Sequence, residues 1–346
     1  MNDLTIITPD DWHLHLRDSP YLEAVIGDTA RQFARAIIMP NLNPPVRTPA
    51  DALAYRERIV AALPNDSGFI PLMTLYLTDN TRVEDIDAAS GSGFIFGAKL
   101  YPAGATTNSD AGVTDLANLY PVFEAMQSRR FILQVHGEAT GDDIDVFDRE
   151  KVFIEQSLGR IRRDFPELPI VFEHATTRDA IDYVRAAEAN LAATITPHHL
   201  LINRNAMFRG GIRPHHYCLP VAKREAHRLA LLEAASSGDR RFFAGTDSAP
   251  HSRLAKESSC GCAGIYSAHS ALELYAEAFD EVGDFTHFEA FLSRRGADFY
   301  RLPQNQGKIS LARQEWILPE SLPYPDAELV PFRAGETLRW KQVSND

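Results

Sequence analysis

The sequence predicts a (β/α)8 TIM barrel with a short C-terminal extension. Short runs rich in β-branched and aromatic residues recur along the chain, and stretches with helical periodicity lie between most of them. Eight such strands alternating with helices over about 250 residues are typical of this barrel. The structural rival is a doubly wound open sheet, but no G-x-G-x-x-G follows the first strand. The alternation therefore favours a closed barrel.

The expected elements follow the chain in order, and Pro or Gly clusters mark the gaps between them. The first strand begins at 4–7 and continues toward His15, and the other seven are 34–39, 69–77, 94–100, 131–135, 170–172, 191–195 and 242–245. Helical periodicity is expected at 51–63, 115–126, 151–165, 179–187 and 223–235.

We expect one domain over residues 1–346, because no linker or low-complexity segment divides the chain. The barrel should cover about 4–300, and the pattern then fades into a proline-containing tail at about 301–346. The apolar run Leu329-Val330-Pro331-Phe332 predicts that this tail packs back on the barrel.

Charge and composition argue against several classes of protein. The net charge is −12 with no basic stripe, which disfavours nucleic acid as a partner. No run approaches the ~18 apolar residues of a membrane span, and the N-terminus lacks the features of a signal peptide. Three cysteines favour a reducing cytoplasm over a disulfide framework. Cys260-Gly261-Cys262 resembles part of a metal site, but no second cysteine pair follows, so buried or loop thiols are the favoured interpretation.

Reactive side chains recur at the C-terminal ends of the predicted strands, where a barrel enzyme keeps its active site. The first strand ends at His13 and His15, which share one face of a strand. The fourth, fifth, sixth and eighth strands end at Lys99, His136, His174 and Asp247. Singly, each has an ordinary explanation: a hydrogen-bonded core histidine, a solvated lysine or an aspartate that caps a turn. Because all six converge on one mouth of the barrel, we interpret them as a metal site.

At these positions the chain resembles the binuclear metal-dependent amidohydrolases, and more closely the short, stand-alone (type II) bacterial dihydroorotases. The motifs that carry the resemblance are 11–18 (DWHLHLRD), 39–42 (MPNL), 99–102 (KLYP), 136–138 (HGE), 173–174 (EH) and 245–251 (GTDSAPH). The tail segments 329–332 (LVPF) and 335–340 (GETLRW) also fit. One departure is Ser19-Pro20, where the family often has Gly after Arg-Asp.

The resemblance implies a reaction and a ligand set. The reaction is the reversible, zinc-dependent cyclisation of N-carbamoyl-L-aspartate to L-dihydroorotate plus water, a step of de novo pyrimidine (UMP) biosynthesis. Two divalent metal ions per subunit, with zinc expected, would be bridged by a hydroxide that acts as nucleophile. The implied ligands are His13, His15 and Asp247 for one metal, His136 and His174 for the other, and Lys99, as N6-carboxylysine, between them. Asp247 would also be the general acid and base.

A second implied group binds the carboxylate of the substrate. Arg17 lies two residues past His15, on what we expect to be the same face of an extended segment, where a guanidinium binds a carboxylate bidentately. The resemblance adds Asn41 and His251 to this carboxylate site.

The resemblance also implies contacts to the substrate ring. Leu219 and Ala263 match positions that act chiefly through backbone groups. The segment 102–112 is rich in small residues, and composition alone makes it a plain solvent loop. The resemblance makes it a lid in which Thr106 and Thr107 donate hydrogen bonds to the substrate.

Other interpretations stay open at this point. A cyclic amidase of the hydantoinase or allantoinase type would use the same metals, although the carboxylate-binding residues argue against it. An inactive homologue acting as an assembly scaffold typically lacks ligands, and none is missing here. His198 and His199 follow the seventh strand, but the ligand set is complete without them, so a supporting or structural role is favoured. The family also suggests a homodimer.

Overall fold

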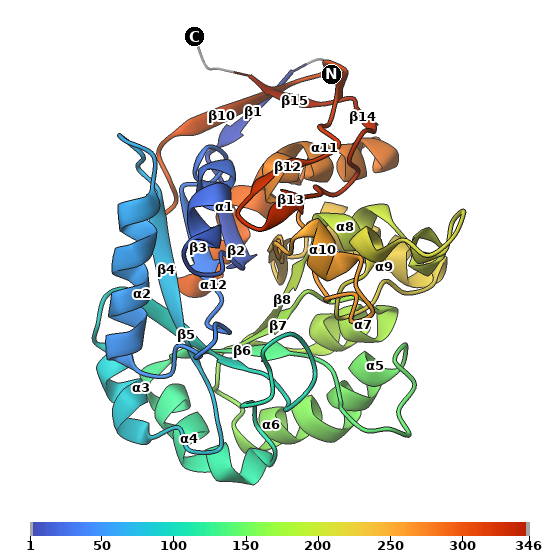
Figure 1. Ribbon diagram of the computed structural model, residues 1–346. Helices are drawn as coiled ribbons and strands as arrows, with labels where there is room; N and C mark the ends of the chain where they lie inside the picture. The colour runs from blue at the N-terminus through green and yellow to red at the C-terminus, as the bar shows by residue number, and fades with distance from the viewer. Residues whose placement is uncertain (1–2, 344–346) are drawn as a thin grey trace.

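The computed structural model describes residues 3–343, and an eight-stranded parallel sheet forms its centre. Each strand pairs with the next one along the chain, with helices around the sheet (Figure 1). The barrel strands are β2 (Asp10–Leu14), β3 (Arg35–Ile38), β4 (Ile70–Tyr76), β5 (Ile95–Leu100), β6 (Ile132–His136), β7 (Ile170–Glu173), β8 (Leu191–Ile195) and β9 (Phe242–Ala244). The remaining strands are β1 (Asp3–Ile7), β10 (Lys308–Ala312), β11 (Trp316–Ile317), β12 (Leu322–Tyr324), β13 (Ala327–Leu329), β14 (Thr337–Leu338) and β15 (Lys341–Val343). The predicted (β/α)8 barrel is confirmed.

The sheet closes where its first and last strands meet. The Asp247 N–H donates to the carbonyl of His13 over 2.8 Å, and the His15 N–H donates to the carbonyl of Ser248 over 3.1 Å. A parallel bridge between Leu14 and Ser248 continues this contact. Closure therefore brings together the two segments that carry His13, His15 and Asp247.

Helices surround the barrel. The α-helices are α1 (Tyr21–Ala30), α2 (Pro49–Ala62), α3 (Val83–Ser90), α4 (Tyr120–Arg129), α5 (Arg149–Phe153), α6 (Gly159–Asp164), α7 (Arg178–Ala186), α8 (Pro197–Leu201), α9 (Glu225–Ser236), α10 (Arg253–Lys256), α11 (Ala271–Val282) and α12 (Arg295–Tyr300). Short 3-10 or π turns are η1 (Leu116–Leu119), η2 (Ile154–Leu158), η3 (Arg204–Met207), η4 (Pro214–His216), η5 (Ala268–Ser270) and η6 (Ala290–Arg294). Each of the five predicted helices is present, and the one expected at 51–63 begins at Pro49 because a capping box joins Thr48 and Asp51.

The prediction for the first strand is wrong in one respect, because residues 4–7 do not belong to the barrel. They lie in β1, which pairs antiparallel with β10 of the tail, and β10 pairs in turn with β15 (Figure 1). Pro9 separates β1 from β2, since it has no N–H to give to a continuous ladder. Asp10 then opens the barrel strand, where its carboxylate forms a buried ion pair with Arg35 of β3 at 2.6 Å.

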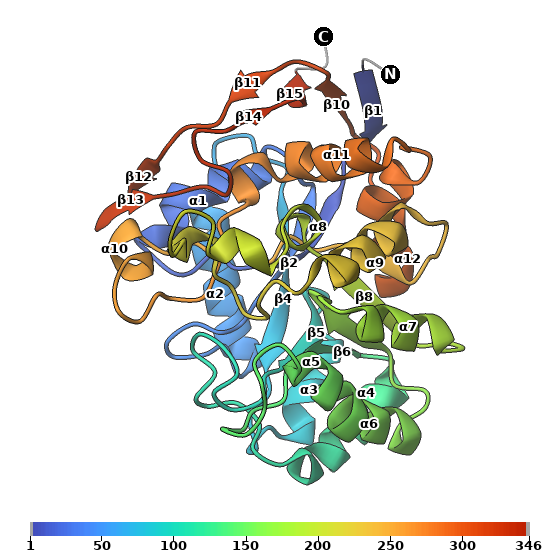
Figure 2. The ribbon, with the colours of Figure 1, turned by 90° about the vertical axis from the view of Figure 1, so that its right-hand side faces the viewer.

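The tail crosses one side of the molecule above α11 (Figure 2). Trp340 and Phe332 are buried there. The Phe332 N–H donates to the carbonyl of Tyr266, and the Trp316 indole N–H donates to the carbonyl of Trp340, each over 2.7 Å. Arg339 forms an ion pair with Glu277 of α11 at 3.0 Å. These contacts cover apolar surface of α11 and stabilise the tail in place.

A cluster of apolar side chains fills the N-terminal side of the barrel interior. Trp12 stacks on Tyr300 of α12 with ring centroids 4.5 Å apart, and Phe243 of β9 meets Trp12 edge-on at 6.1 Å. A Cβ at Gly296 would lie 2.1 Å from the Trp12 indole nitrogen, so the close approach of α12 requires glycine there. The buried members of this apolar plug are Trp12, Ile37, Met39, Leu72, Ile132, Val171, Ala192, Phe243, Ala297 and Tyr300.

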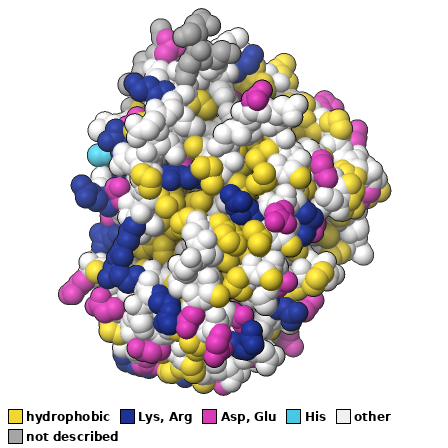
Figure 3. Space-filling view, turned by 90° about the vertical axis from the view of Figure 1, so that its left-hand side faces the viewer, with side chains coloured by type: hydrophobic (Ala, Val, Ile, Leu, Met, Phe, Trp, Pro, Cys, Tyr) yellow, Lys and Arg dark blue, Asp and Glu magenta, His cyan; other side chains and the backbone are white. Residues whose placement is uncertain are grey.

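The surface mixes charges of both signs. On the face drawn in Figure 3, Lys and Arg lie among Asp and Glu, and hydrophobic side chains gather near the middle. Within residues 3–343, no helix combines the length and the apolar character needed to cross a membrane.

Candidate active site

The ends of β2 and β9 place three potential metal ligands together. His15 Nε2 lies 3.1 Å and His13 Nε2 lies 3.4 Å from the Oδ1 atom of Asp247. The three side chains are buried, and their ligand atoms lie within 4.8 Å of one another. Ligand atoms on one shared zinc ion lie about 3–4 Å apart, so this spacing is close to that of a metal site.

Lys99, His136 and His174 form a continuous group with these residues. The His174 ring lies 4.8 Å from the His136 ring and 4.9 Å from the His13 ring, centroid to centroid. Lys99 is fully buried on β5, and burial lowers its pKa to about 8. Near that pH much of the amine is therefore neutral, which is the form that can react with CO2.

The chemistry of these donors fits a metal-binding group. Burial lowers the pKa values of His13 and His174 well below their usual range, so both imidazoles are neutral and keep a lone pair for a metal. The Nζ atom of Lys99 and the Nδ1 atom of His174 are buried and have no hydrogen-bond partner within residues 3–343. Buried polar atoms without partners are rare and costly, and a bound ion would remove that cost.

Carboxylates behind the histidines orient their rings. Glu173 Oε2 lies 2.9 Å from His13 Nδ1 and accepts the Thr194 hydroxyl at 2.6 Å. Glu138 Oε2 lies 2.8 Å from His136 Nε2. A carboxylate on one ring nitrogen fixes the tautomer and raises the basicity of the other. The sequence motifs contain Glu138 and Glu173 but give neither of them a role. For Glu138 the available signal is a carboxylate two residues from a strand-end histidine, whereas the partner of Glu173 is His13 and not the adjacent His174.

Asp11 joins the strand that carries His13 and His15 to the segment that carries Asp247. Its carboxylate accepts hydrogen bonds from the backbone N–H groups of His13 (3.1 Å) and Thr246 (2.8 Å), and from the Thr246 hydroxyl (2.6 Å). This buried carboxylate therefore holds β2 at a fixed distance from the residue that precedes Asp247.

The backbone is left-handed at three site residues. The φ angles are +65° at Arg17, +41° at His174 and +45° at Asp247. Such values are uncommon for residues other than glycine and often mark functional positions. At Arg17 the positive φ angle shows that the expectation of an extended segment is wrong, because the chain turns after His15 instead of continuing as a strand.

The side chains of Arg17 and His251 contact each other beside the potential metal ligands. Arg17 Nη2 donates to His251 Nε2 over 2.9 Å, and Arg17 Nε donates to the carbonyl of Pro250 over 3.1 Å. Burial and the nearby guanidinium lower the pKa of His251, which keeps its ring neutral and able to accept. The turn at Arg17 is held by Tyr55, whose hydroxyl donates to the Arg17 carbonyl at 2.6 Å.

One small cavity brings most of the predicted residues together. It is lined by His13, His15, Arg17, Asn41, Tyr101, Thr106, Thr107, His136, His174, Leu219, Asp247, Ala249, Ala263 and Gly264. Lys99 and His251 are not in this lining, but each contacts a residue that is: Lys99 Nζ lies 5.4 Å from the ring centroid of Tyr101, and His251 contacts Arg17. A larger surface groove between η3, α9 and the tail contains none of the predicted residues.

The segment 102–112 reaches across this cavity. The Asn41 amide donates to the carbonyl of Thr107 over 3.1 Å, and the Asn108 amide donates to the carbonyl of Asn41 over 3.0 Å. On the opposite side, the Thr107 hydroxyl donates to the carbonyl of Ala263 over 3.3 Å. Thr106 and Thr107 both line the cavity.

A buried lysine holds the wall of the cavity that contains Ala263. Lys256 Nζ donates to the carbonyls of Tyr217 (2.7 Å), Cys262 (2.7 Å) and Gly264 (2.8 Å). All three ammonium hydrogens are used, and two acceptors flank Ala263 directly. Sequence reasoning missed Lys256, since a lysine in a short helix gives no sign of where its side chain points.

Comparisons with known proteins agree with this geometry. The model of the Amidohydrolase family matches residues 5–313. A dihydroorotase from Cupriavidus taiwanensis is 64% identical over 338 residues, which is 98% of each chain. Among solved structures, a dihydroorotase from Campylobacter jejuni matches with a TM-score of 0.90 and 38% identity, covering 99% of this chain and 97% of its own. A dihydroorotase from Saccharomyces cerevisiae, in complex with 5-fluoroorotic acid, matches with a TM-score of 0.91 and 33% identity over 99% of each chain. The chain therefore belongs to the amidohydrolase family and, within it, to the dihydroorotases, hydrolases that act on a cyclic amide and use divalent metals.

Proposed function

We propose that this chain interconverts N-carbamoyl-L-aspartate and L-dihydroorotate plus water, a step of de novo pyrimidine biosynthesis, in the cytoplasm. The observation that carries the proposal is the convergence of the metal-binding group and Arg17 on one cavity, in a chain 64% identical to a dihydroorotase. A cyclic amide with a ring carboxylate needs both an activated water and a cation for the carboxylate, and the cavity offers residues for both.

The residues suited to hold two divalent metals, with zinc expected, are His13, His15, Lys99, His136, His174 and Asp247. When bound, such a pair supplies an activated water and a Lewis acid for the amide carbonyl. An ammonium has no lone pair, so Lys99 would act as its N6-carboxylated form, whose two oxygens can serve both ions. Its burial and lowered pKa favour the neutral amine that this modification needs.

Asp247 is the proposed general acid and base. Its Oδ1 atom lies among the imidazoles of His13 and His15, at the C-terminal end of β9 and on the cavity wall. During hydrolysis its carboxylate takes a proton from the attacking water and then gives that proton to the departing ring nitrogen. The same group serves cyclisation in reverse, as microscopic reversibility requires.

Arg17, Asn41 and His251 are proposed to bind the substrate carboxylate. The guanidinium of Arg17 is held from two sides by His251 and Pro250, so little side-chain freedom remains to be lost on binding. Thr106 and Thr107 would donate to the substrate from the segment 102–112, and the backbone of Leu219 and Ala263 would contact the ring.

A substrate panel tests this proposal. Purified protein with its metals is assayed with L-dihydroorotate, hydantoin and allantoin, and only L-dihydroorotate should be turned over efficiently. Arg17→Met should raise the KM for dihydroorotate by about tenfold or more, because a charged hydrogen bond contributes ~1.5–3 kcal/mol. Arg82→Met is the matched control, since Arg82 is exposed, pairs with Asp85 and does not line the cavity. Preference for hydantoin or allantoin would favour the other cyclic amidases, and metal-loaded protein with no turnover would favour a scaffold.

We also propose one domain over residues 1–346 and a homodimer, without nucleic acid or membrane as partners. The pairing of β1 with β10 and the burial of Trp340 support the single domain. A single cooperative unfolding transition would agree with one domain, and light scattering at the mass of two chains would agree with the dimer.

A further inference from the structure

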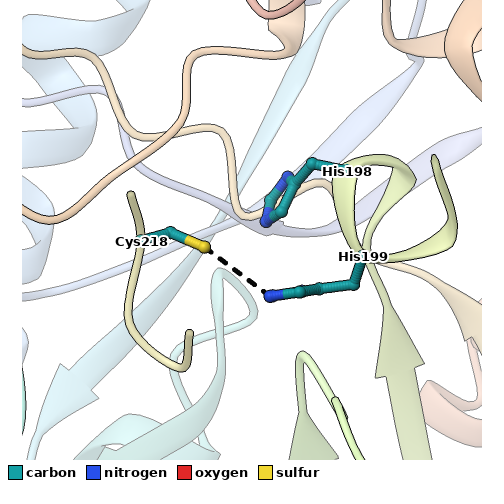
Figure 4. A group of neighbouring side chains, drawn as sticks. All are labelled: His198, His199 and Cys218. Carbon is teal, nitrogen blue, oxygen red and sulfur yellow. Dashed lines mark hydrogen bonds between the residues drawn. The ribbon is translucent and has the colours of Figure 1, made fainter. Parts of the chain in front are cut away.

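A second group of potential metal ligands lies outside the proposed catalytic set. His198 and His199 belong to α8, which follows β8, and Cys218 lies on a separate segment that faces them (Figure 4). All three side chains are buried, and their ligand atoms lie within 4.8 Å of one another. Figure 4 shows the Cys218 sulfur and a nitrogen of each imidazole pointing toward the same space.

The spacing of these atoms matches a zinc site that contains sulfur. Cys218 Sγ lies 3.6 Å from His199 Nε2. With Zn–S of about 2.3 Å and Zn–N of about 2.0–2.1 Å, two ligands at a tetrahedral angle lie about 3.5 Å apart. His198 belongs to the same turn of α8, and its ring centroid lies 4.5 Å from that of His199. Thiolate together with imidazole is a donor set typical of zinc.

His198 provides an independent reason to expect a ligand. Both of its ring nitrogens are buried, and neither has a hydrogen-bond partner within residues 3–343. An unpaired buried polar atom is destabilising, and His198 carries two of them. Burial lowers the pKa of this imidazole, so the ring is neutral and has a lone pair available.

The other two residues are already oriented. His199 Nδ1 lies 2.8 Å from the Thr196 hydroxyl, which fixes the ring and leaves Nε2 toward Cys218. His199 Nε2 (3.0 Å) and Cys218 Sγ (3.3 Å) both donate to the carbonyl oxygen of Pro220, so each of these atoms carries a hydrogen. Metal binding would replace these two hydrogen bonds. Because both atoms already meet at one carbonyl oxygen, the fold brings the two ligand atoms together without the metal.

We propose that His198, His199 and Cys218 bind a further zinc-type cation, separate from the catalytic metals. The thiol of Cys218 releases its proton to solvent as the S–metal bond forms. The proton of His199 moves from Nε2 to Nδ1, where the Thr196 hydroxyl accepts it, so both imidazoles bind as neutral donors. Leu219 lies between Cys218 and Pro220 and lines the catalytic cavity. The bound ion would therefore fix the backbone on this side of the cavity and join it to α8.

Cobalt provides a selective probe, because none of the proposed catalytic ligands contains sulfur. Protein is purified from cobalt-supplemented cells, in a Cys260→Ser/Cys262→Ser background that removes the only other thiols. We expect three cobalt ions per chain and a near-ultraviolet thiolate-to-cobalt charge-transfer band. Cys218→Ser should abolish the band and lower the content to two, and His198→Gln should weaken binding of the third ion at least about tenfold.

Several outcomes would overturn the proposal. Two cobalt ions per chain without the charge-transfer band would show that the cluster does not bind metal, whatever the variants do. A band that persists in Cys218→Ser would place the thiolate elsewhere. If Cys218→Ser does not fold, the band and the metal content of the parent protein and of His198→Gln still decide the question. Dihydroorotate turnover of the parent protein is measured separately, so failure of this site is distinguishable from failure of the proposed function.

Discussion

The two ends of the barrel interior are equally buried but chemically opposite. On the N-terminal side, Trp12, Phe243 and Tyr300 pack ring against ring in the apolar plug. On the C-terminal side, Lys99 and His174 carry buried polar atoms that have no partner within residues 3–343. Apolar burial on the N-terminal side stabilises the folded state, whereas the unpaired polar atoms on the C-terminal side destabilise it. Stability and chemistry are thus divided between the two ends of the same strands.

Gln134 lies at the boundary between these two layers. It is buried on β6, two residues before His136, and its amide donates to the Tyr300 hydroxyl over 2.8 Å. Every second residue of β6 points into the barrel, so this one strand contributes first to the apolar plug and then, at His136, to the proposed metal site. This difference predicts that substitutions on the C-terminal side change activity and metal content, whereas substitutions in the apolar plug on the N-terminal side change stability.

Lys99→Ala should have the largest effect on the C-terminal side. Activity should fall by more than about a thousandfold, because metal catalysis contributes several kcal/mol and each ~1.4 kcal/mol is tenfold. Metal content should fall as well, and short carboxylic acids should restore part of the activity by supplying the missing oxygens. Metal analysis and dihydroorotate turnover measure both effects. Lys151→Ala, an exposed lysine, is the control, and full activity of Lys99→Ala would show that the assignment is wrong.

Phe243→Ala tests the N-terminal side. Removing a buried phenyl ring should lower the free energy of unfolding by ~3–5 kcal/mol, measured by urea denaturation. Metal content and kcat should stay unchanged at temperatures where the variant is folded. Phe243→Leu keeps most of the volume and should cost less than about 1.5 kcal/mol. Loss of bound metal from folded Phe243→Ala would contradict the division between the two ends.

The sequence was sufficient to predict the barrel and the strand ends that face its C-terminal mouth. Buried parallel strands are apolar runs in the sequence, and a polar residue at the end of such a run is conspicuous, as at Lys99 and His136. The first strand was misassigned because residues 4–7 are equally apolar, and only the pairing of β1 with β10 reveals their place. The five ranges of predicted helical periodicity also leave out α1, α3, α8, α10, α11 and α12.

Contacts that depend on tertiary structure were out of reach. The left-handed turn at Arg17 cannot be read from an arginine, which usually avoids positive φ. Lys256 lies on a four-residue helix, and its three carbonyl acceptors come from two separate segments. The same holds for Glu173, whose partner His13 is 160 positions away.

Glu173→Gln should have an intermediate effect, on metal affinity. Glu173 receives hydrogen bonds from both His13 and Thr194 at the same oxygen, and an amide oxygen there carries no negative charge to raise the basicity of the His13 imidazole. Loss of the carboxylate behind a ligating imidazole typically weakens metal binding by ~10–100-fold, which competition with a chelator would measure. Glu273→Gln is a matched control, because Glu273 is also buried but lies on α11 and accepts from Gln342 of the tail. Equal affinities for the two variants would argue against a role of Glu173 in orienting His13.

Lys256→Met should have the smallest effect, and it should appear in KM. The ammonium does not line the cavity, but it holds the carbonyls on both sides of Ala263, so its loss should loosen that wall without touching the reacting atoms. We expect the KM for dihydroorotate to rise several-fold, up to about tenfold, while kcat changes little, because binding contacts are lost equally in the ground and transition states. Arg253→Met is the control on the same short helix, since Arg253 pairs with Glu328 and Glu257 near the surface. Lys256→Arg should recover KM only in part, because a planar guanidinium cannot direct three donors from one point. An unchanged KM in Lys256→Met would mean that Lys256 only stabilises the fold. The part of the C-terminal side that acts in the reaction would then be limited to the proposed metal-binding residues.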